Sequence, residues 1–312
     1  MRVVVSGAAG FIGSHLVEAL LARGDEVVGL DNFITGRSQN LDGLPHSSGL
    51  TVIEHDVIRP IDIDGGVDLV LHFACPASPP DYLAHPVATL DVETAGTRNL
   101  LELARAKRAR FLLASTSEVY GDPLEHPQSE TYWGNVNPIG PRSVYDEGKR
   151  CAEAYTMAYH RDGVDTGIVR IFNTYGERMR PHDGRALPNF LFQALRGEDL
   201  TVYGSGEQTR SLCYISDLVR GILLLAGSDE HLPVNLGNAE EITMLRLAQR
   251  ILELVGGRSR IVFRELPVDD PQRRRPDTTR ARQLLGWEPT VPLEDGLART
   301  LQWFRSEMGV SV

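Results

Sequence analysis

A tyrosine and a lysine stand four residues apart in the segment Tyr145-Asp146-Glu147-Gly148-Lys149. The segment has a helical period, which places the two side chains one above the other beside an apolar stripe of Val144, Gly148, Cys151, Ala152 and Tyr155. A free tyrosine has a pKa near 10, so a base at neutral pH needs help of about 3 pH units, or roughly 4 kcal/mol. A neighbouring ammonium gives such help by favouring the phenolate. The pair predicts a tyrosine base, although an ordinary amphipathic helix can carry the same residues.

A second polar segment, Ala114-Ser115-Thr116-Ser117-Glu118-Val119-Tyr120-Gly121, directly follows an apolar run that predicts a buried strand. In open α/β sheets ligands bind at the carboxyl ends of the strands, so we expect these side chains to face a ligand. Thr116 offers a hydroxyl that can relay a proton to Tyr145, and Glu118 adds a carboxylate. A plain turn of small polar residues is the alternative interpretation.

Three glycines in Gly7-Ala8-Ala9-Gly10-Phe11-Ile12-Gly13 follow the first predicted strand and open the first predicted helix. Glycines at this spacing allow a tight turn, the close approach of a pyrophosphate and close helix–strand packing, while the helix N-terminus faces the negative charge. The second predicted strand ends at Asp31, whose carboxylate can bind an adenosine ribose and repels a 2′-phosphate. These residues predict a dinucleotide site that prefers NAD to NADP.

Further residues extend this site. We expect Asn32 and the Thr35-Gly36 turn to close over the same ribose, and Asp56-Val57, after the third predicted strand, to meet the adenine. The positive nicotinamide ring of a bound NAD is a second source of phenolate stabilisation at Tyr145.

These segments need a scaffold of alternating strands and helices, and the first two-thirds of the chain has that pattern. Helical patterns such as Ser14–Arg23, which Gly24 ends, lie between apolar runs. The runs predict buried strands at Arg2–Ser6, Glu26–Leu30, Thr51–His55, Asp68–Phe73, Arg110–Ser115 and Asp165–Phe172. The sequence therefore predicts an α/β fold with a doubly wound, parallel Rossmann-type sheet.

After about residue 173 the regular alternation of strand and helix patterns ends. Turn-rich segments alternate with helical patterns around Asn189–Arg196, Ser216–Ala226 and Met244–Val255, which predicts a smaller C-terminal α/β lobe that binds the substrate. We expect residues 1–173, joined by about 212–240, to form the NAD-binding domain. Residues 174–211 and 241–312 would then form the lobe.

Composition narrows the class of protein. Among the 312 residues, 42% are hydrophobic, and no apolar stretch reaches the roughly 20 residues of a membrane helix. The net charge of −10 argues against a nucleic-acid binder, because phosphate backbones need a basic face. Three cysteines without a CxxC pair, and an N-terminus unlike a signal peptide, predict a cytoplasmic protein with reduced thiols. Nine scattered histidines without carboxylates at ligand spacing predict no metal site.

Over nearly its whole length the sequence resembles the extended short-chain dehydrogenase/reductase superfamily and, more narrowly, the UDP-glucuronate decarboxylases. The glycine and Tyr-x-x-x-Lys patterns are typical of the whole superfamily. The narrower likeness lies in Thr116-Ser117-Glu118 and Trp133–Pro141, with further similarity in His72–Pro80, Arg170–Gly176, Leu200–Arg210 and Asp269-Asp270-Pro271.

The resemblance implies that Thr116, Tyr145 and Lys149 form a hydride-transfer triad with Glu118 near the sugar. One arginine of the run before Pro276 would meet the substrate carboxylate, and spacing from the proline favours Arg274, with Arg275 as its rival. The resemblance also implies cofactor contact at Ala74. It places the following residues around UDP-glucuronate: Pro76, Ser117, Asn173, Arg178, Asn189, Tyr203 and Arg210.

The implied reaction follows from a chemical requirement: a sugar acid loses carbon dioxide easily only when a carbonyl lies β to the carboxylate. Oxidation at C4 would give a 4-keto acid. Decarboxylation, protonation at C5 and reduction by the retained cofactor would then give UDP-xylose. Alternatives on the same fold are a hexose 4,6-dehydratase, a UDP-sugar 4-epimerase and a non-catalytic NAD-sensing protein. Ser117 stands where a dehydratase usually carries an acid, and a sensor has no need of the Tyr145–Lys149 pair.

Two further expectations come from the resemblance. The family usually dimerises through a helix bundle, so a homodimer is expected, and the apolar face of residues 143–160 is compatible with it.

Members often carry asparagine and lysine near Thr89–Thr94, whereas this chain has Asp91, Val92 and Glu93. Glu93 is therefore the departure that could alter the surroundings of the tyrosine.

Overall fold

The structure is a computed structural model that describes residues 1–265 and 273–310; Asp269-Asp270-Pro271 lies outside these ranges. Its centre is a seven-stranded parallel sheet in the order β11-β6-β5-β4-β1-β2-β3. The strands are β1 (Arg2–Ser6), β2 (Glu26–Asp31), β3 (Leu50–Glu54), β4 (Leu69–His72), β5 (Arg110–Thr116), β6 (Thr166–Ile171) and β11 (Pro233–Leu236). The doubly wound Rossmann-type sheet predicted from the sequence is confirmed.

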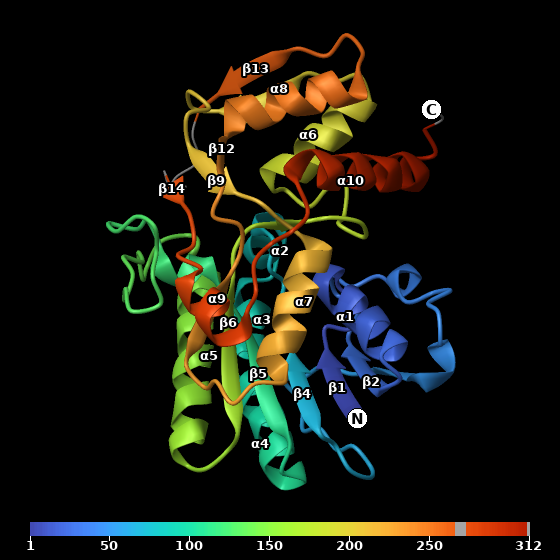
Figure 1. The fold of residues 1–312 in the computed structure, drawn as a ribbon, viewed down its shortest axis with the longest axis vertical. Helices are drawn as coiled ribbons and strands as arrows, with labels where there is room; N and C mark the ends of the chain where they lie inside the picture. The colour runs from blue at the N-terminus through green and yellow to red at the C-terminus, as the bar shows by residue number, and fades with distance from the viewer. Residues whose placement is uncertain (266–272, 311–312) are drawn as a thin grey trace.

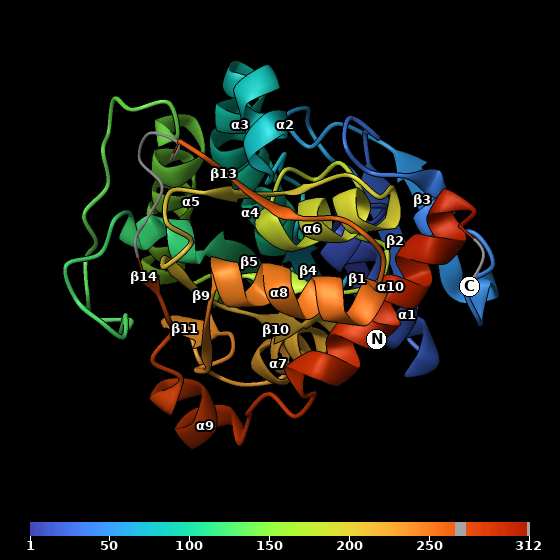
Figure 2. The same cartoon turned by 90° about the horizontal axis from the view of Figure 1, so that it is seen from above.

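Alternate side chains of the central strands fill two cores, one on each face of the sheet. In β1, Val3 and Val5 belong to one core and Val4 to the other, and all three are fully buried. A strand covered on both faces needs apolar residues at consecutive positions, which explains the unbroken apolar runs. Strand β3 is different. Its residues 51–54 are exposed at the sheet edge (Figure 2), so the prediction of a buried strand there is wrong.

Helices cover both faces of the sheet (Figure 1). Helices α1 and α7 pack together on one face, and α4 and α5 pack together on the other. A continuous helical stretch of α3, a π-helical turn and α4 runs past α5. These elements are α1 (Phe11–Ala22), α2 (Pro79–Ala84), α3 (Pro86–Asp91), the π-helical turn (Val92–Gly96), α4 (Thr97–Lys107), α5 (Ser143–Arg161) and α7 (Ile215–Ala226), with 3-10 turns at Ser38–Asn40, Ser47–Gly49 and Ser117–Tyr120.

The smaller lobe lies beyond the carboxyl ends of the central strands (Figure 1). It contains the parallel pairs β7–β10 and β8–β13 and the three-stranded sheet β12-β9-β14. Helix α10 packs on α6 and α8, whereas α9 packs beside α7 and β11. The remaining elements are β7 (Thr174–Tyr175), β8 (Leu200–Tyr203), β9 (Thr209–Ser211), β10 (Cys213–Tyr214), β12 (Glu241–Thr243), β13 (Ile261–Arg264), β14 (Arg273–Arg274), α6 (Ala186–Leu195), α8 (Met244–Val255), α9 (Thr279–Leu285) and α10 (Leu293–Met308).

Two helices begin earlier than their sequence patterns predict. Helix α1 begins at Phe11 rather than Ser14, and α6 at Ala186 rather than Asn189. Neither has a side-chain cap, so the sequence holds no capping signal at these starts. Within the ranges described, no helix has the length and apolar character needed to cross a bilayer, and no three His, Cys, Asp or Glu side chains gather as a metal site would require.

Candidate active site

The glycine turn between β1 and α1 packs too closely against the neighbouring backbone to hold side chains. A Cβ on Gly7 would lie 2.7 Å from the backbone of Phe73 and Ala74, and a Cβ on Gly13 would lie 1.9 Å from the Gly7 carbonyl oxygen. Gly7 also has a φ of +73°, which glycine tolerates. Because Gly10, the N-cap of α1, gives the helix no side-chain cap, the first N–H groups of α1 are available to a pyrophosphate. The turn fits NAD.

Asp31, at the carboxyl end of β2, holds the same turn together. Its carboxylate accepts hydrogen bonds from the N–H groups of Ala9 at 2.9 Å and Phe33 at 2.8 Å. Gly36 lies so close that a Cβ there would be 2.7 Å from the carboxylate oxygen. Burial raises the pKa of Asp31, and the two N–H groups oppose that rise. The remaining lone pairs of the carboxylate can accept ribose hydroxyls.

The other predicted cofactor residues flank this turn. Thr35 lines the central cavity. Asn32 donates a hydrogen bond of 3.2 Å to Asp56, which joins the carboxyl ends of β2 and β3. Val57 is buried, and Ala74 donates from its N–H group to a serine hydroxyl of β1 at 3.4 Å.

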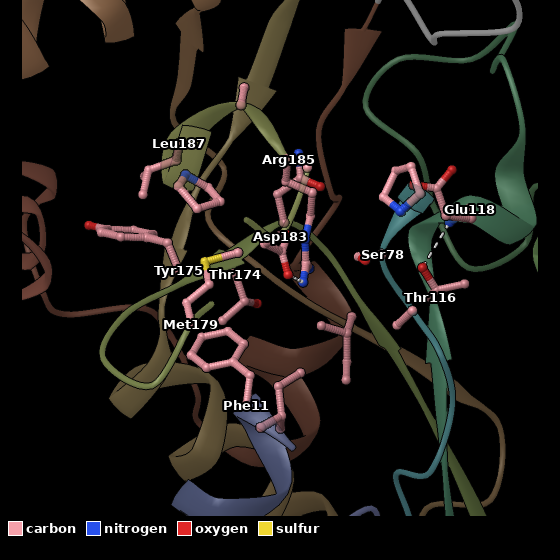
Figure 3. Close-up of a pocket in the computed structure, with 18 of the residues that line it drawn as sticks. Phe11, Ser78, Thr116, Glu118, Thr174, Tyr175, Met179, Asp183, Arg185 and Leu187 are labelled. Carbon is pink, nitrogen blue, oxygen red and sulfur yellow. Dashed lines mark hydrogen bonds and ion pairs between the residues drawn. The ribbon is translucent and has the colours of Figure 1, made fainter. Parts of the chain in front are cut away.

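A cavity of about 450 Å³ lies between the carboxyl edge of the sheet and the smaller lobe (Figure 3). Small-molecule sites are typically about 300–1,000 Å³. The cavity is lined by Gly7, Gly10, Phe11, Ile12, Gly13, Thr116, Ser117, Glu118, Tyr145, Lys149, Asn173, Arg178, Asn189, Tyr203, Arg210 and Arg274, all predicted from the sequence. Pro76 is buried outside this lining, although Cys75 and Ala77 on either side belong to it.

Helix α5 places Tyr145 and Lys149 on its buried face, where they are 6% and 3% exposed. The Lys149 Nζ atom lies 5.9 Å from the centre of the Tyr145 ring. It donates to the Ala114 carbonyl at 2.8 Å and lies 2.8 Å from Glu93 Oε1. Burial raises the pKa of Tyr145; the Lys149 ammonium and a hydrogen bond with Thr116 oppose this rise without overcoming it. The phenolate therefore needs a further positive charge in the cavity.

Two arginines hold Glu118 just beyond β5. Its N–H donates to Thr116 Oγ1 at 3.2 Å (Figure 3), which forms the turn after the strand. Its carboxylate accepts hydrogen bonds from Arg142 Nη2 at 2.7 Å and Arg274 Nη2 at 2.9 Å. Burial opposes ionisation of Glu118, but the guanidinium groups of Arg274 and Arg142 outweigh it and lower the pKa to about 2. With two positive charges and one negative, this Glu118 cluster can attract a further carboxylate.

The structure separates the two rival arginines. Arg274 is 3% exposed and lines the cavity, whereas Arg275 is partly exposed and places Nη1 3.7 Å from Glu241. The two side chains diverge because successive residues of an extended chain point to opposite sides.

The predicted nucleotide-binding residues come from β6 to β9 and line the lobe side of the cavity. Arg178 has a φ of +63°, and its guanidinium donates to Glu18 of α1 at 2.5 Å. Arg210 donates to the Thr209 carbonyl at 2.9 Å. These residues therefore form the lobe side of the cavity, and Arg178 also links the lobe to α1.

The sequence reasoning missed three side chains of the site. The Tyr82 ring stacks on Tyr145, with centroids 5.3 Å apart and planes 8° from parallel. Arg142 binds Glu118, and Arg185 lines the cavity paired with Asp183 at 2.8 Å (Figure 3). No periodicity marks these residues: Tyr82 and Arg142 meet segments distant in the chain, and Arg185 pairs locally with Asp183. The one available signal was the position of Arg142 directly after the family-like stretch 133–141.

Comparisons with known proteins agree with this geometry. Residues 3–237 match the model of the NAD dependent epimerase/dehydratase family. The chain is 54% identical to UDP-glucuronic acid decarboxylase 1 of Danio rerio, over 98% of this chain and 73% of that protein. It is also 54% identical to UDP-glucuronic acid decarboxylase 4 of Arabidopsis thaliana, over 99% of this chain and 69% of that protein.

A solved structure shares the architecture. UDP-glucuronic acid 4-epimerase of Bacillus cereus, in complex with UDP-glucuronic acid and NAD, matches with a TM-score of 0.87 at 29% identity. The match covers 98% of this chain and 100% of that chain. The same architecture thus holds a dinucleotide and a UDP-sugar acid together in that protein.

Proposed function

The chain belongs to the NAD dependent epimerase/dehydratase family, and we propose that within it the protein decarboxylates UDP-glucuronate to UDP-xylose with tightly bound NAD. The observation that carries this proposal is the Glu118 cluster, because it lines the same cavity as Tyr145 and Lys149. Positive charge for a sugar carboxylate thereby accompanies a base that can act on a sugar hydroxyl.

The reaction begins at the 4-hydroxyl of the sugar. NAD held by the glycine turn and Asp31 would supply reversible hydride transfer at C4. Tyr145 takes the hydroxyl proton, and the Thr116 hydroxyl relays it or holds the oxygen in place. Lys149, fixed by the Ala114 carbonyl, favours the phenolate. Because Tyr145 is buried, it can keep this proton until the ketone is reduced again.

The Glu118 cluster acts in the second half of the reaction. Arg142 and Arg274 orient the carboxylate of the 4-keto acid, whose C4 carbonyl lies β to it and takes up the electrons as carbon dioxide leaves. The resulting enolate needs a proton at C5. Glu118 is ionised because its pKa is about 2, so the donor is Arg274 or a water molecule that Glu118 holds.

The same cluster argues against the alternatives. A 4,6-dehydratase needs an acid to protonate the leaving 6-hydroxyl; Ser117 is too weak an acid, and Glu118 is already ionised at neutral pH. A 4-epimerase must let the keto sugar rotate, whereas two guanidinium groups would hold its carboxylate. A non-catalytic NAD sensor has no need of the buried Tyr145–Lys149 pair.

Incubation of the purified protein with UDP-glucuronate tests the proposal, with products followed by NMR. UDP-xylose and carbon dioxide should form in equal amounts without accumulation of NADH. A UDP-4-keto-pentose with stoichiometric NADH would show that the final reduction is missing. UDP-galacturonate as the product would contradict decarboxylation and assign the protein to the epimerases.

We further propose that the protein forms a homodimer through α5. We also propose that it is located in the cytoplasm. Tyr155 and Met157 of α5 are only partly buried, which leaves apolar surface for a second copy. The three cysteines are free thiols, as is usual in a reducing compartment. A monomer in sedimentation experiments, or recovery of the protein outside the cytoplasmic fraction, would contradict these proposals.

A further inference from the structure

Glu93 lies in the π-helical turn between α3 and α4 and has no exposed surface. Its Oε1 atom is 2.8 Å from Lys149 Nζ, and that lysine side chain is 4% exposed. A carboxylate buried this deeply is retained in its ionised form only when it is paired. None of the reaction steps proposed above uses Glu93.

The packing of α5 makes room for this carboxylate. A Cβ on Gly148 would lie 3.2 Å from Glu93 Cγ and 3.3 Å from Glu93 Cβ. Helix α5 therefore approaches the π-helical turn closely at the residue next to Lys149. From the other side, the Ala114 carbonyl of β5 holds Nζ at 2.8 Å. The ammonium thus donates a hydrogen bond to the Ala114 carbonyl and forms an ion pair with Glu93.

The ionisable groups around this pair come from several elements: Tyr145 and Cys151 of α5, Cys75 after β4, His72 of β4 facing Lys149, and Arg185 of the lobe facing Tyr145. Burial and then Glu93 raise the pKa of Cys75, while burial and then Lys149 lower the pKa of His72 to about 3, so both stay neutral. Arg185 is itself paired with Asp183 at 2.8 Å. Beside Tyr145, Lys149 lowers the pKa of the tyrosine more than Glu93 raises it, so Glu93 offsets part of the effect of Lys149.

We propose that Glu93 is a positioning residue that offsets part of the field of Lys149 at Tyr145, so that Lys149 alone does not ionise the tyrosine and its basicity follows the charge of the nicotinamide. The proposal rests on the use of Tyr145 as the base. With oxidised, positively charged NAD bound, Tyr145 would ionise; with reduced, neutral NADH bound, it would hold its proton. The proton taken from the sugar therefore stays on the tyrosine while the ketone exists and is present when the ketone is reduced.

A charge series at position 93 tests this. The ultraviolet absorbance of tyrosinate is titrated in the holoenzyme loaded with NADH, after subtraction of the Tyr145→Phe spectrum. Glu93→Gln should lower the midpoint by about 1–2 pH units, because it removes a negative charge near Tyr145 in a site with an effective dielectric constant of about 20. In this variant the ammonium keeps the Ala114 carbonyl as a partner. The acid limb of kcat should move in the same direction.

Shorter side chains separate charge from size. Glu93→Asp should keep the wild-type midpoint, and Glu93→Asn should behave like Glu93→Gln; this second pair carries the comparison if the Gln variant does not fold. Glu147→Gln is the matched control, because Glu147 lies on the partly exposed side of α5, 3.4 Å from Arg150, and its loss should leave the midpoint unchanged.

The proposal would be overturned if the tyrosinate midpoint depended on the length of side chain 93 rather than on its charge. It would also be overturned if the midpoint were the same in the three position-93 variants and in Glu147→Gln. The titration needs no turnover of UDP-glucuronate. Its failure is therefore distinct from a failure of the proposed decarboxylation.

Discussion

The two ends of the cavity are built differently. The cofactor end is mostly backbone: it has a glycine turn and the first N–H groups of α1, beside one carboxylate, Asp31, that two backbone N–H groups hold. The sugar end consists of charged side chains, with Glu118 between Arg142 and Arg274 and a buried lysine–glutamate pair nearby. Backbone groups are placed by their own element, whereas buried charges depend on partners from elsewhere. Binding and chemistry are thus separable in this protein.

The largest expected effect is the loss of kcat when the proposed catalytic base, Tyr145, is replaced. Tyr145→Phe removes only a hydroxyl at the sugar end, so kcat should fall by about 10²–10⁴-fold, the usual contribution of a general base. Bound NAD, measured by absorbance after release from the purified protein, should be unchanged. Full turnover by this variant would remove Tyr145 from the mechanism.

The next effect concerns the two adjacent arginines. Arg274→Ala leaves the buried Glu118 short of a partner and removes a contact to the substrate carboxylate, so kcat/KM should fall by at least about 30-fold. Arg275→Ala, the matched control, removes a partly exposed side chain next to Glu241 and should change kcat/KM by less than about threefold. Equal losses in the two variants would contradict the assignment of Arg274 to the site.

At the cofactor end we expect the opposite result: weaker NAD binding with little change in turnover. Asp31→Asn weakens the ribose contact, so the Kd for NAD, measured by calorimetry on protein freed of nucleotide, should rise by about 10–100-fold. The value of kcat at saturating NAD should stay within about threefold of wild type, and discrimination against NADP should weaken. A variant that binds NAD normally but turns over slowly would break the separation of the two ends.

The smallest effect is on stability. Burial and the charge of Glu118 raise the pKa of Asp146 to about 7, above its unfolded value near 4. The folded protein therefore holds this proton more tightly than the unfolded chain, and the contribution of Asp146 to stability is lost as pH rises from about 4 to 7. Asp146→Asn removes this loss, so its Tm advantage over wild type should be about 2–4 °C larger at pH 8 than at pH 5. Parallel Tm curves for variant and wild type would contradict the raised pKa.

Local patterns predicted much of the fold and the cofactor end. Uninterrupted apolar runs such as Val3–Val5 indicate strands buried on both faces, and the glycine turn needs only its own neighbours to form. The apolar pattern does not predict the exposure of the edge strand β3, since that exposure depends on which strand lies last in the sheet. The first turns of α1 and α6 are not predicted either, because no side-chain cap marks where these helices begin.

Spacing within a few residues is enough to place Tyr145 and Lys149 on one helix face and to open a dinucleotide site with glycines. Which charged side chains meet depends instead on how the whole chain folds. Glu118 and Arg274 are 156 positions apart and come together because the lobe folds over the ends of the strands, and Glu93 reaches Lys149 because α5 packs against the π-helical turn. Contacts between distant segments depend on packing of the whole chain, which no local pattern records.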